Sequence, residues 1–237
     1  MRRLVVNDVR NTLGEHTVWD DLCEWLNAEF VGGDYGTLAE TVNADDADLI
    51  VRNATWFPPI KARCPQISLL QDIFTEGPQR EMQEAVIRSS SAVVFNSDFT
   101  TSKYAASAAV GGPPPLLRVI PLPVDFSVFV PSNSMGMQQA LGLPDGCVLW
   151  VGASQGAAGQ VKGWDIMLKV ARANPDLHFV CVFKDAAPEV PPNVRCFVRL
   201  THEELVKVMG ACRVGLCTSR TESQHLAGIE MGACGLN

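Results

Sequence analysis

Short apolar runs separated by polar, helix-like segments set the pattern of this sequence. The runs are rich in Val, Ile, Leu and Phe and are apolar at nearly every position, which is typical of parallel strands buried on both faces. We predict strands at residues 4–6, 49–52, 67–70, 92–96, 118–121, 148–152, 178–183, 195–198 and 214–217. The regular alternation of these strands with helical segments predicts an α/β fold.

End signals and apolar periodicity predict the helices between the strands. Residues 17–30 carry an apolar stripe at helical spacing, and residues 78–89 open with a proline in the first turn. Thr201 and Glu204 have the spacing of a capping box at the start of a helix over 201–211. Two further helices are predicted at residues 97–107 and 162–173.

The composition changes between residues 121 and 146, where Pro, Gly, Ser and Asn accumulate. Such a stretch is typical of an interdomain linker. We therefore predict a Rossmann-like domain over residues 1–124, a linker over 125–145 and a second Rossmann-like domain over 146–237. The second domain offers four strands, fewer than the five or six of a typical doubly wound sheet, and is expected to be incomplete.

Composition excludes several classes of partner. The chain has 237 residues, of which 47% are hydrophobic and 19% charged, and its net charge is −7. It has no Lys/Arg run and no apolar stretch near ~20 residues, so we expect neither a nucleic-acid partner nor a transmembrane segment. The eight cysteines are scattered without a C-x-x-C pair, which predicts free thiols in the cytoplasm and no zinc site. Homo-oligomerisation is left open.

Two glutamates near the end of the sequence carry most of the candidate chemistry. Glu222 follows the predicted strand 214–217, and Glu230 lies in a helix of small residues that ends at Gly235. In α/β proteins, ligands bind in the crevice at the carboxyl ends of strands. The start of that helix would also present backbone N–H groups to phosphate or sugar oxygens. These groups belong to Gln224, His225 and Leu226.

Four segments, in order, resemble the retaining, nucleotide-sugar-dependent glycosyltransferases of family 4. They are Val93–Ser97, Val119–Pro131, Val151-Gly152 followed by Lys162–Asp165, and Glu222–Gly235. The residues before them match only loosely. The resemblance implies a GT-B fold, with two Rossmann-like domains facing across a cleft. It also implies transfer of a sugar from a nucleotide sugar, UDP- or GDP-linked, with retention and without a cofactor.

The resemblance also assigns roles to individual residues. Glu230 would bind the ribose hydroxyls, and Glu222 would face the donor sugar. Lys162 would stabilise the diphosphate leaving group as its charge develops, so Glu222 and Lys162 are the candidate catalytic residues. Gly152 and Ser154 would line the phosphate loop before Lys162, where small residues permit close backbone approach. Each of these residues also has a purely structural interpretation: Glu230 as a helix acid, Glu222 as a loop acid and Lys162 as a surface lysine.

The first domain would contribute the acceptor side of the site. Its candidate residues are Gly14, His16, Trp56 and Gln71. Gln71 stands where many family members carry a histidine, and an amide cannot take up a proton. Ala153 stands about where the family usually has an arginine, which removes one of two cations on the diphosphate. The acceptor, whether sugar, lipid or protein, is left open.

Asp46-Ala47-Asp48 matches the D-x-D metal motif of the other main glycosyltransferase fold. These acids precede a predicted strand instead of following one, so we interpret them as a solvated strand entry and predict no essential metal. A non-catalytic relative that acts as a binding or scaffold protein is the alternative function. A nicotinamide-dependent dehydrogenase is disfavoured, because the glycines between 152 and 159 lack the G-x-G-x-x-G spacing.

Overall fold

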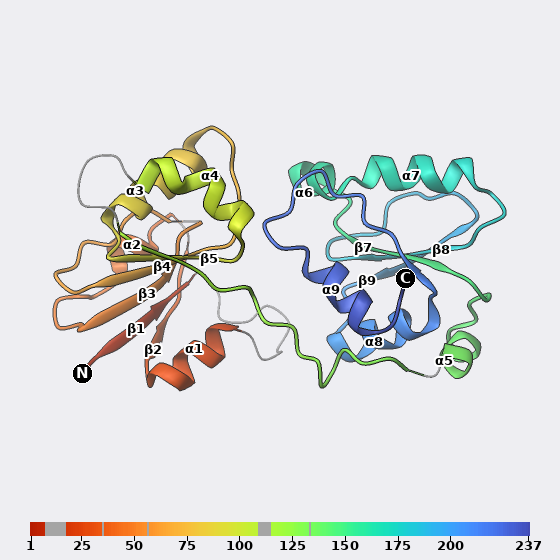
Figure 1. Ribbon diagram of the computed structural model, residues 1–237, viewed down its shortest axis with the longest axis horizontal. Coiled ribbons are helices and arrows are strands. Elements are labelled where there is room, and N and C mark those ends of the chain that lie inside the picture. Colours follow the sequence, from red (N-terminus) through yellow and green to blue (C-terminus); the bar gives the residue numbers. More distant parts are fainter. Residues whose placement is uncertain (8–17, 35, 56, 109–114, 133) are drawn as a thin grey trace. The chain divides into compact units, whose positions relative to one another are not determined.

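The protein forms two compact units, Met1–Pro123 and Val124–Asn237 (Figure 1). A computed structural model describes residues 1–7, 18–34, 36–55, 57–108, 115–132 and 134–237. Each unit holds one all-parallel sheet with helices on both of its faces. Both units are therefore α/β layers of the Rossmann-like kind that the strand and helix alternation predicts.

The first unit is built on a six-stranded sheet with the order β2-β1-β3-β4-β5-β6. Its strands are β1 (Arg3–Val6), β2 (Glu29–Val31), β3 (Leu49–Asn53), β4 (Gln66–Leu70), β5 (Ala92–Phe95) and β6 (Leu116–Val119). Its helices are α1 (Val18–Leu26), α2 (Leu38–Thr41), α3 (Pro78–Ser89) and α4 (Asp98–Ala108). Helices α3 and α4 pack on one face, and α1 packs on the other (Figure 1).

The second unit is built on a four-stranded sheet with the order β10-β7-β8-β9. Its strands are β7 (Val148–Gly152), β8 (Phe179–Phe183), β9 (Val194–Val198) and β10 (Val214–Gly215). Its helices are α5 (Ser134–Leu141), α6 (Gly156–Lys162), α7 (Trp164–Ala173), α8 (His202–Ala211) and α9 (Leu226–Ala233). Helices α6 and α7 lie on one face of this sheet, and α5, α8 and α9 lie on the other (Figure 1).

The strand order reverses once in each sheet. The second sheet grows from β7 through β8 to β9, and the chain then returns to place β10 on the free side of β7. The loops after the neighbouring strands β7 and β10 therefore run to opposite faces of the sheet, one to α6 and the other to α9. A reversal of this kind opens a crevice at the carboxyl ends of the strands, where α/β proteins bind ligands.

Local signals predicted several elements well. Helix α3 spans Pro78–Ser89, and Thr201 caps α8 in a capping box with Glu204, as predicted. The segment 17–30 is different, because α1 ends at Leu26 and Asn27 turns the chain with a φ of 46°. The residues that follow form the short strand β2 (Glu29–Val31), which was not predicted because the helical spacing of apolar residues continues to position 30.

The segment 125–145, expected as a linker, packs on the second unit instead. Phe129 is buried in the core between the sheet and α8, and α5 packs against α8. The Gln138 side chain donates a hydrogen bond to the carbonyl of Ala211 at 3.2 Å. Pro and Gly in this stretch therefore shape a connection that is part of the domain.

The helix predicted over 162–173 begins two residues later, as α7, because Lys162 instead ends the preceding helix α6. Gly163 has a φ of 69° and ends α6 in the left-handed conformation before α7 begins at Trp164. A Cβ atom at Gly163 would lie 2.0 Å from the carbonyl oxygen of Thr218. Lys162 is consequently the last residue of α6, and not the first residue of the following helix.

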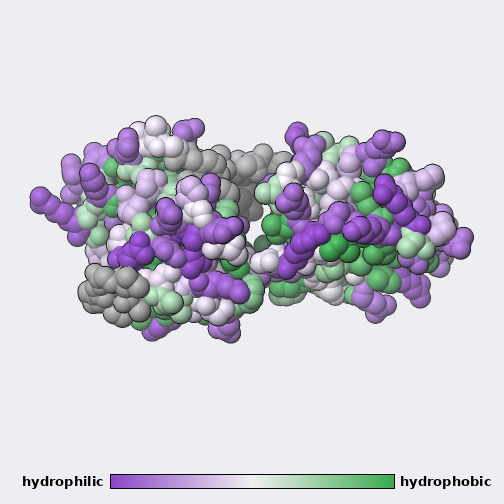
Figure 2. All heavy atoms as spheres, turned by 90° about the horizontal axis from the view of Figure 1, so that it is seen from above, coloured by the Kyte–Doolittle hydropathy of each residue, from purple (hydrophilic) through white to green (hydrophobic). Residues whose placement is uncertain are grey.

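Hydrophilic side chains spread over most of the visible surface of both units, with smaller apolar patches among them (Figure 2). This mixture agrees with a mean hydropathy of +0.10. Within the described residues, none of the helices combines the length and the apolar character that crossing a membrane requires.

We expect Gly163→Ala to destabilise the second unit strongly, as measured by urea unfolding. Gly146→Ala is the matched control, because Gly146 also has a positive φ of 76° but a Cβ added there would have no atom within 4 Å. The left-handed backbone alone costs about 1–2 kcal/mol for alanine, and the clash at Gly163 adds roughly 1–3 kcal/mol. Equal losses in the two variants would contradict the close contact with Thr218.

Candidate functional site

An ion pair lies where the order of the second sheet reverses. The ammonium of Lys162, at the end of α6, is 2.6 Å from Oε1 of Glu222, in the loop after β10. The two side chains are partly buried, with exposed fractions of 33% and 20%. A charge-assisted contact at this distance is stronger than a neutral hydrogen bond. The structure therefore brings together the two residues that the sequence proposed for catalysis.

His225 extends this ion pair toward β10. Its Nε2 is 3.7 Å from Oε1 of Glu222, and its Nδ1 is 3.4 Å from the thiol sulfur of Cys217. Burial lowers the pKa of His225, although the charge of Glu222 acts in the opposite direction. A Cβ at Gly228 would lie 2.3 Å from Nδ1, so only glycine there lets the ring fold back over the first turn of α9.

Thr218 fixes the backbone that carries Lys162. The indole Nε1 of Trp150 donates to the Thr218 hydroxyl at 2.8 Å, and this hydroxyl donates to the carbonyl of Lys162 at 2.9 Å. Both Trp150 and Thr218 are buried. In a buried position a hydrogen bond stabilises the fold, and a polar group left without one lowers the free energy of unfolding. Thr218 is a positioning residue that the sequence alone did not reveal.

The loop after β7 is arranged differently from the expected phosphate loop. Helix α6 starts at Gly156, and the carboxylate of Asp185 accepts hydrogen bonds from the backbone N–H of Ser154 and Gln155, at 3.0–3.2 Å. Burial alone would raise the pKa of Asp185, but these backbone donors outweigh it and the pKa is lowered. A carboxylate of the protein therefore already occupies the N–H groups before α6.

Gly152 has a packing role in the same loop. A Cβ at this position would lie 2.7 Å from the Trp150 ring and 3.3 Å from Cβ of Lys162. The glycine thus lets α6 approach the end of β7 closely enough for Lys162 to reach Glu222.

Glu230 lies on α9 and stands apart from this ion pair. Burial raises its pKa, and the charge of His202 on α8 partly opposes the rise. In the described part of the chain, its carboxylate forms neither an ion pair nor a side-chain hydrogen bond. A half-buried acid with a raised pKa is a candidate ligand-binding group.

The residues before α9 form its N-terminal turn. His225 directly precedes the helix, and the N–H of Leu226 donates to the carbonyl of Gln224 at 2.9 Å. The Leu226 amide, proposed from the sequence as an anion donor, is therefore bound within the turn.

Arg220 is a further cation of this loop, but it is engaged elsewhere. It pairs with Asp165 at 2.8 Å and donates to the carbonyl of Gln160 at 2.6 Å. It lines an open cavity of about 660 Å³ beside α6, together with Ser154 and Trp164. In this arrangement it does not replace the arginine that the resemblance leads one to expect near Ala153.

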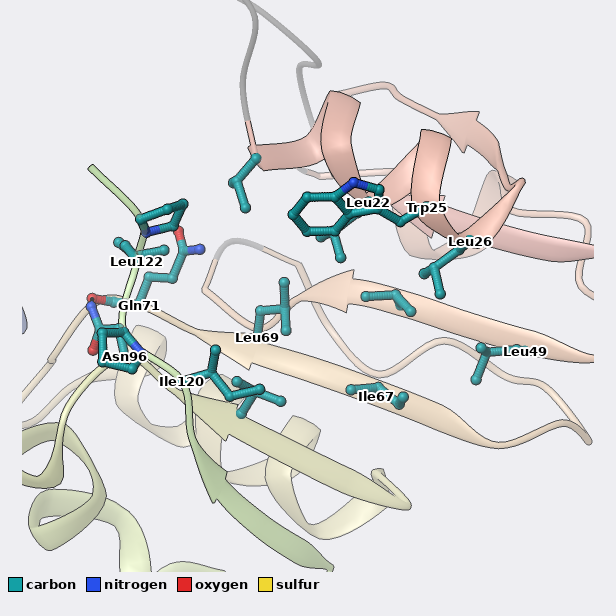
Figure 3. A pocket seen from close by; sticks show the side chains of 15 residues that line it. Leu22, Trp25, Leu26, Leu49, Ile67, Leu69, Gln71, Asn96, Ile120 and Leu122 are labelled. Carbon is teal, nitrogen blue, oxygen red and sulfur yellow. Dashed lines mark hydrogen bonds between the residues drawn. The ribbon is translucent and has the colours of Figure 1, made fainter. Parts of the chain in front are cut away.

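The acceptor candidates fall in the first unit. Gly14, His16 and Trp56 lie outside the described residues. Gln71 follows β4 and lines an apolar cavity of about 410 Å³ between α1 and the segment after β6 (Figure 3).

Arg52 stabilises the loop after β3, at the same edge of the first sheet. Its guanidinium is buried and donates to the carbonyls of Asn53 at 3.0 Å, Pro58 at 2.7 Å and Phe57. Burial lowers its pKa to about 9. These bonds hold the loop after β3 against the sheet.

The acids of the D-x-D sequence bind an arginine. Arg2 forms an ion pair with Asp46 through its guanidinium, and its backbone N–H donates to the carboxylate of Asp48 at 2.5 Å. In the described ranges, no three His, Cys, Asp or Glu side chains are grouped so that they could hold a metal ion.

Solved structures with a similar fold include HepE bound to UDP-glucose and two kinds of sugar-phosphate synthase. The chain superposes on Anabaena HepE in complex with UDP-glucose with a TM-score of 0.71 and 17% identity, covering 100% of this chain and 79% of HepE. For sucrose-phosphate synthase from Thermosynechococcus elongatus, the TM-score is 0.65 and the identity 18%, over 80% of this chain and 55% of that one. The chain thus spans little more than half of that enzyme.

A trehalose-phosphate synthase (UDP-forming) from Burkholderia vietnamiensis is also similar. Its TM-score is 0.61 and its identity 14%, over 83% of this chain and 58% of that one. No protein-family model and no curated protein sequence matches the chain. The likeness therefore defines the fold, and it confirms the predicted class of an α/β protein with two Rossmann-like units.

We expect Glu230→Gln to stabilise the second unit at pH 7 and to lose this advantage near pH 4.5. A raised carboxyl pKa means that the ionised side chain destabilises the fold at neutral pH, and that the cost disappears as the pH falls through the folded pKa toward the ordinary value of 4.5. Urea unfolding at both pH values measures the difference.

Glu204→Gln is the matched control for this experiment. Backbone and side-chain hydrogen bonds from Thr201 lower the pKa of Glu204, so its amide variant should be destabilised at pH 7. If Glu230→Gln also destabilised the protein at pH 7, the assignment of Glu230 as a half-buried acid that lacks an ion-pair partner among the described residues would be wrong.

Proposed function

We propose that this protein is a retaining glycosyltransferase that binds the nucleotide of a nucleotide-sugar donor on its second unit. The observation that carries the proposal is the Lys162–Glu222 ion pair, extended by His225, at the order reversal of the second sheet. This is the position at which a parallel α/β sheet binds ligands. The two-glutamate motif around it supplies acids for both the sugar and the ribose.

Lys162 would supply the main electrostatic contribution to the reaction. As the bond between the anomeric carbon and the diphosphate breaks, negative charge develops on the departing phosphate oxygens. A preorganised ammonium in a partly buried site stabilises this charge more than water does. Before the donor binds, Glu222 holds the ammonium in place at 2.6 Å, so little reorganisation is required.

The two glutamates would bind different parts of the donor. Glu222 is an acceptor for the hydroxyls of the donor sugar, and Glu230 is an acceptor for the two vicinal hydroxyls of the ribose. Hydrogen bonds to the ribose would also satisfy the carboxylate of Glu230, whose burial is otherwise unfavourable. In this proposal, retention follows from the family resemblance, and Lys162 takes the place of a metal ion.

The solved relatives support a UDP-linked donor. HepE was crystallised with UDP, with UDP and glucose, and with UDP-glucose, and one similar trehalose-phosphate synthase is described as UDP-forming. We therefore propose UDP-glucose as the first donor to test. The eight cysteines are free thiols, which suits a reducing compartment, and we propose a cytoplasmic location.

A non-catalytic, sugar-nucleotide-binding relative is the second candidate. Ala153 in place of an arginine, Gln71 in place of a histidine and the carboxylate of Asp185 at the start of α6 favour it. Release of UDP from UDP-glucose decides between the two candidates. A rate above the uncatalysed background, abolished in Lys162→Ala, supports the enzyme, and binding without release supports the alternative.

We expect Lys162→Ala and Glu230→Ala each to weaken UDP binding by roughly tenfold or more, as measured by isothermal titration calorimetry. Lys169→Ala is the matched control, because Lys169 is 78% exposed and, among the described residues, forms its one ion pair with Asp165, at 3.9 Å on the same helix. Unchanged affinity in both site variants, or an equal loss in the control, would overturn the assignment of the nucleotide site.

A further inference from the structure

The imidazole of His225 faces a carboxylate oxygen that a lysine already holds. Oε1 of Glu222 is 2.6 Å from the ammonium of Lys162 and 3.7 Å from Nε2 of His225. The first contact is a charge-assisted hydrogen bond, whereas the second is just longer than a hydrogen bond. Both nitrogens therefore point to one oxygen, and the imidazole is the next donor within reach of it.

The ring of His225 is held from two sides. It is 23% exposed and directly precedes α9, and Gly228 leaves the room for it, because a Cβ there would lie 2.3 Å from Nδ1. On the other side, the thiol sulfur of Cys217 is 3.4 Å from the same Nδ1. A shift of roughly 1 Å would bring Nε2 within hydrogen-bond length of Glu222.

These neighbours select one tautomer of His225. Burial lowers the pKa of His225, so the ring is neutral at pH 7. Burial also raises the pKa of Cys217, so the thiol keeps its hydrogen. An ionised carboxylate can only accept, and a neutral imidazole has one donor nitrogen and one acceptor nitrogen. Nε2 therefore carries the hydrogen toward Glu222, and Nδ1 accepts from the thiol.

Two charges act on His225 in opposite directions. Among the described residues, the titratable groups that face the ring are Glu222 and Cys217 in the segment after β10 and Lys162 on α6. After burial, the charge of Glu222 raises the pKa of His225 and that of Lys162 lowers it. A diphosphate bound to Lys162 would neutralise the lowering charge and add negative charge beside the ring, which favours the imidazolium.

We propose that His225 takes the place of Lys162 at Glu222 when a nucleotide sugar binds, by gaining a proton and donating Nε2–H to the carboxylate. This exchange rests on the proposed donor site. The proton comes from solvent and enters at Nδ1, and the sulfur of Cys217 then accepts from Nδ1–H, because a thiol can be a weak donor or a weak acceptor. His225 is thus a positioning residue that holds Glu222 for the sugar while Lys162 binds the diphosphate.

Histidine titration by NMR tests the exchange without a ligand. Lys162→Met removes the ammonium and leaves Glu222, so the pKa of His225 should rise above its value in the unchanged protein. Glu222→Gln should lower it instead. Lys169→Met, at a 78% exposed position, is the control and should leave it unchanged. The exposed His178 of the same unit should titrate alike in all samples if they are folded. An unchanged or lower pKa of His225 in Lys162→Met would overturn the proposal.

Calorimetry with UDP-glucose measures the proton itself. Its phosphates do not titrate near neutral pH, unlike the terminal phosphate of UDP. At pH 6.5, the binding enthalpies in PIPES and in bis-Tris, which have different ionisation enthalpies, give the number of protons taken up. We expect net uptake by the unchanged protein and by His178→Gln, and none by His225→Gln. Because the proton is gained on binding, affinity should rise as the pH falls, about tenfold for each unit by which binding raises the pKa of His225.

Variants of Cys217 separate the thiol from the rest of the step. Cys217→Ser keeps a group that donates and accepts and should retain the proton uptake, whereas Cys217→Val should reduce it. Equal uptake in these two variants would exclude the thiol from the exchange. UDP-glucose binding without proton uptake refutes the exchange and leaves the donor site intact. If UDP-glucose does not bind at all, the proposed donor site is wrong and the exchange is excluded with it, even where the ligand-free titration shows the expected shifts.

Discussion

The hydrogen bonds of Thr218 are the constraint on which the candidate site of the second unit depends. Its hydroxyl joins the Trp150 indole of β7 to the carbonyl of Lys162 at the end of α6, and its own carbonyl lies against Gly163. Helix α6 must therefore end where the loop after β10 passes. This places the Lys162 ammonium against Glu222, four residues beyond Thr218, and the remaining groups of the site gather around that pair.

The fold was predictable to the extent that local signals specify it. Near-continuous apolar runs mark buried parallel strands, Pro78 marks the start of α3, and Thr201 with Glu204 marks the start of α8. The pairing of Lys162 with Glu222 was also accessible, because the motifs that contain them resemble a family with both residues in one site. A left-handed turn at Asn27 left no such signal, so β2 was hidden within a predicted helix.

The parts of the site that were missed depend on contacts between distant residues. Asp185 reaches the amides of Ser154 and Gln155 across about thirty positions of sequence, and Thr218 reaches Trp150 across 68. Neither contact produces a periodic pattern that could be recognised in the sequence. The apolar cavity beside α1 has the same origin, because only the strand order reveals which apolar residues come to line it. Distance in sequence, and not weak propensity, limited the prediction.

The affinities of Glu222→Gln for UDP and for UDP-glucose test the central claim most directly. If Lys162 binds the diphosphate and Glu222 binds the sugar, the amide releases the ammonium from its ion pair while removing a sugar contact. UDP should then bind as tightly as before or more tightly, and UDP-glucose should lose its advantage over UDP. An equal loss of affinity for both ligands, or no change in either, would contradict a donor site built on this ion pair.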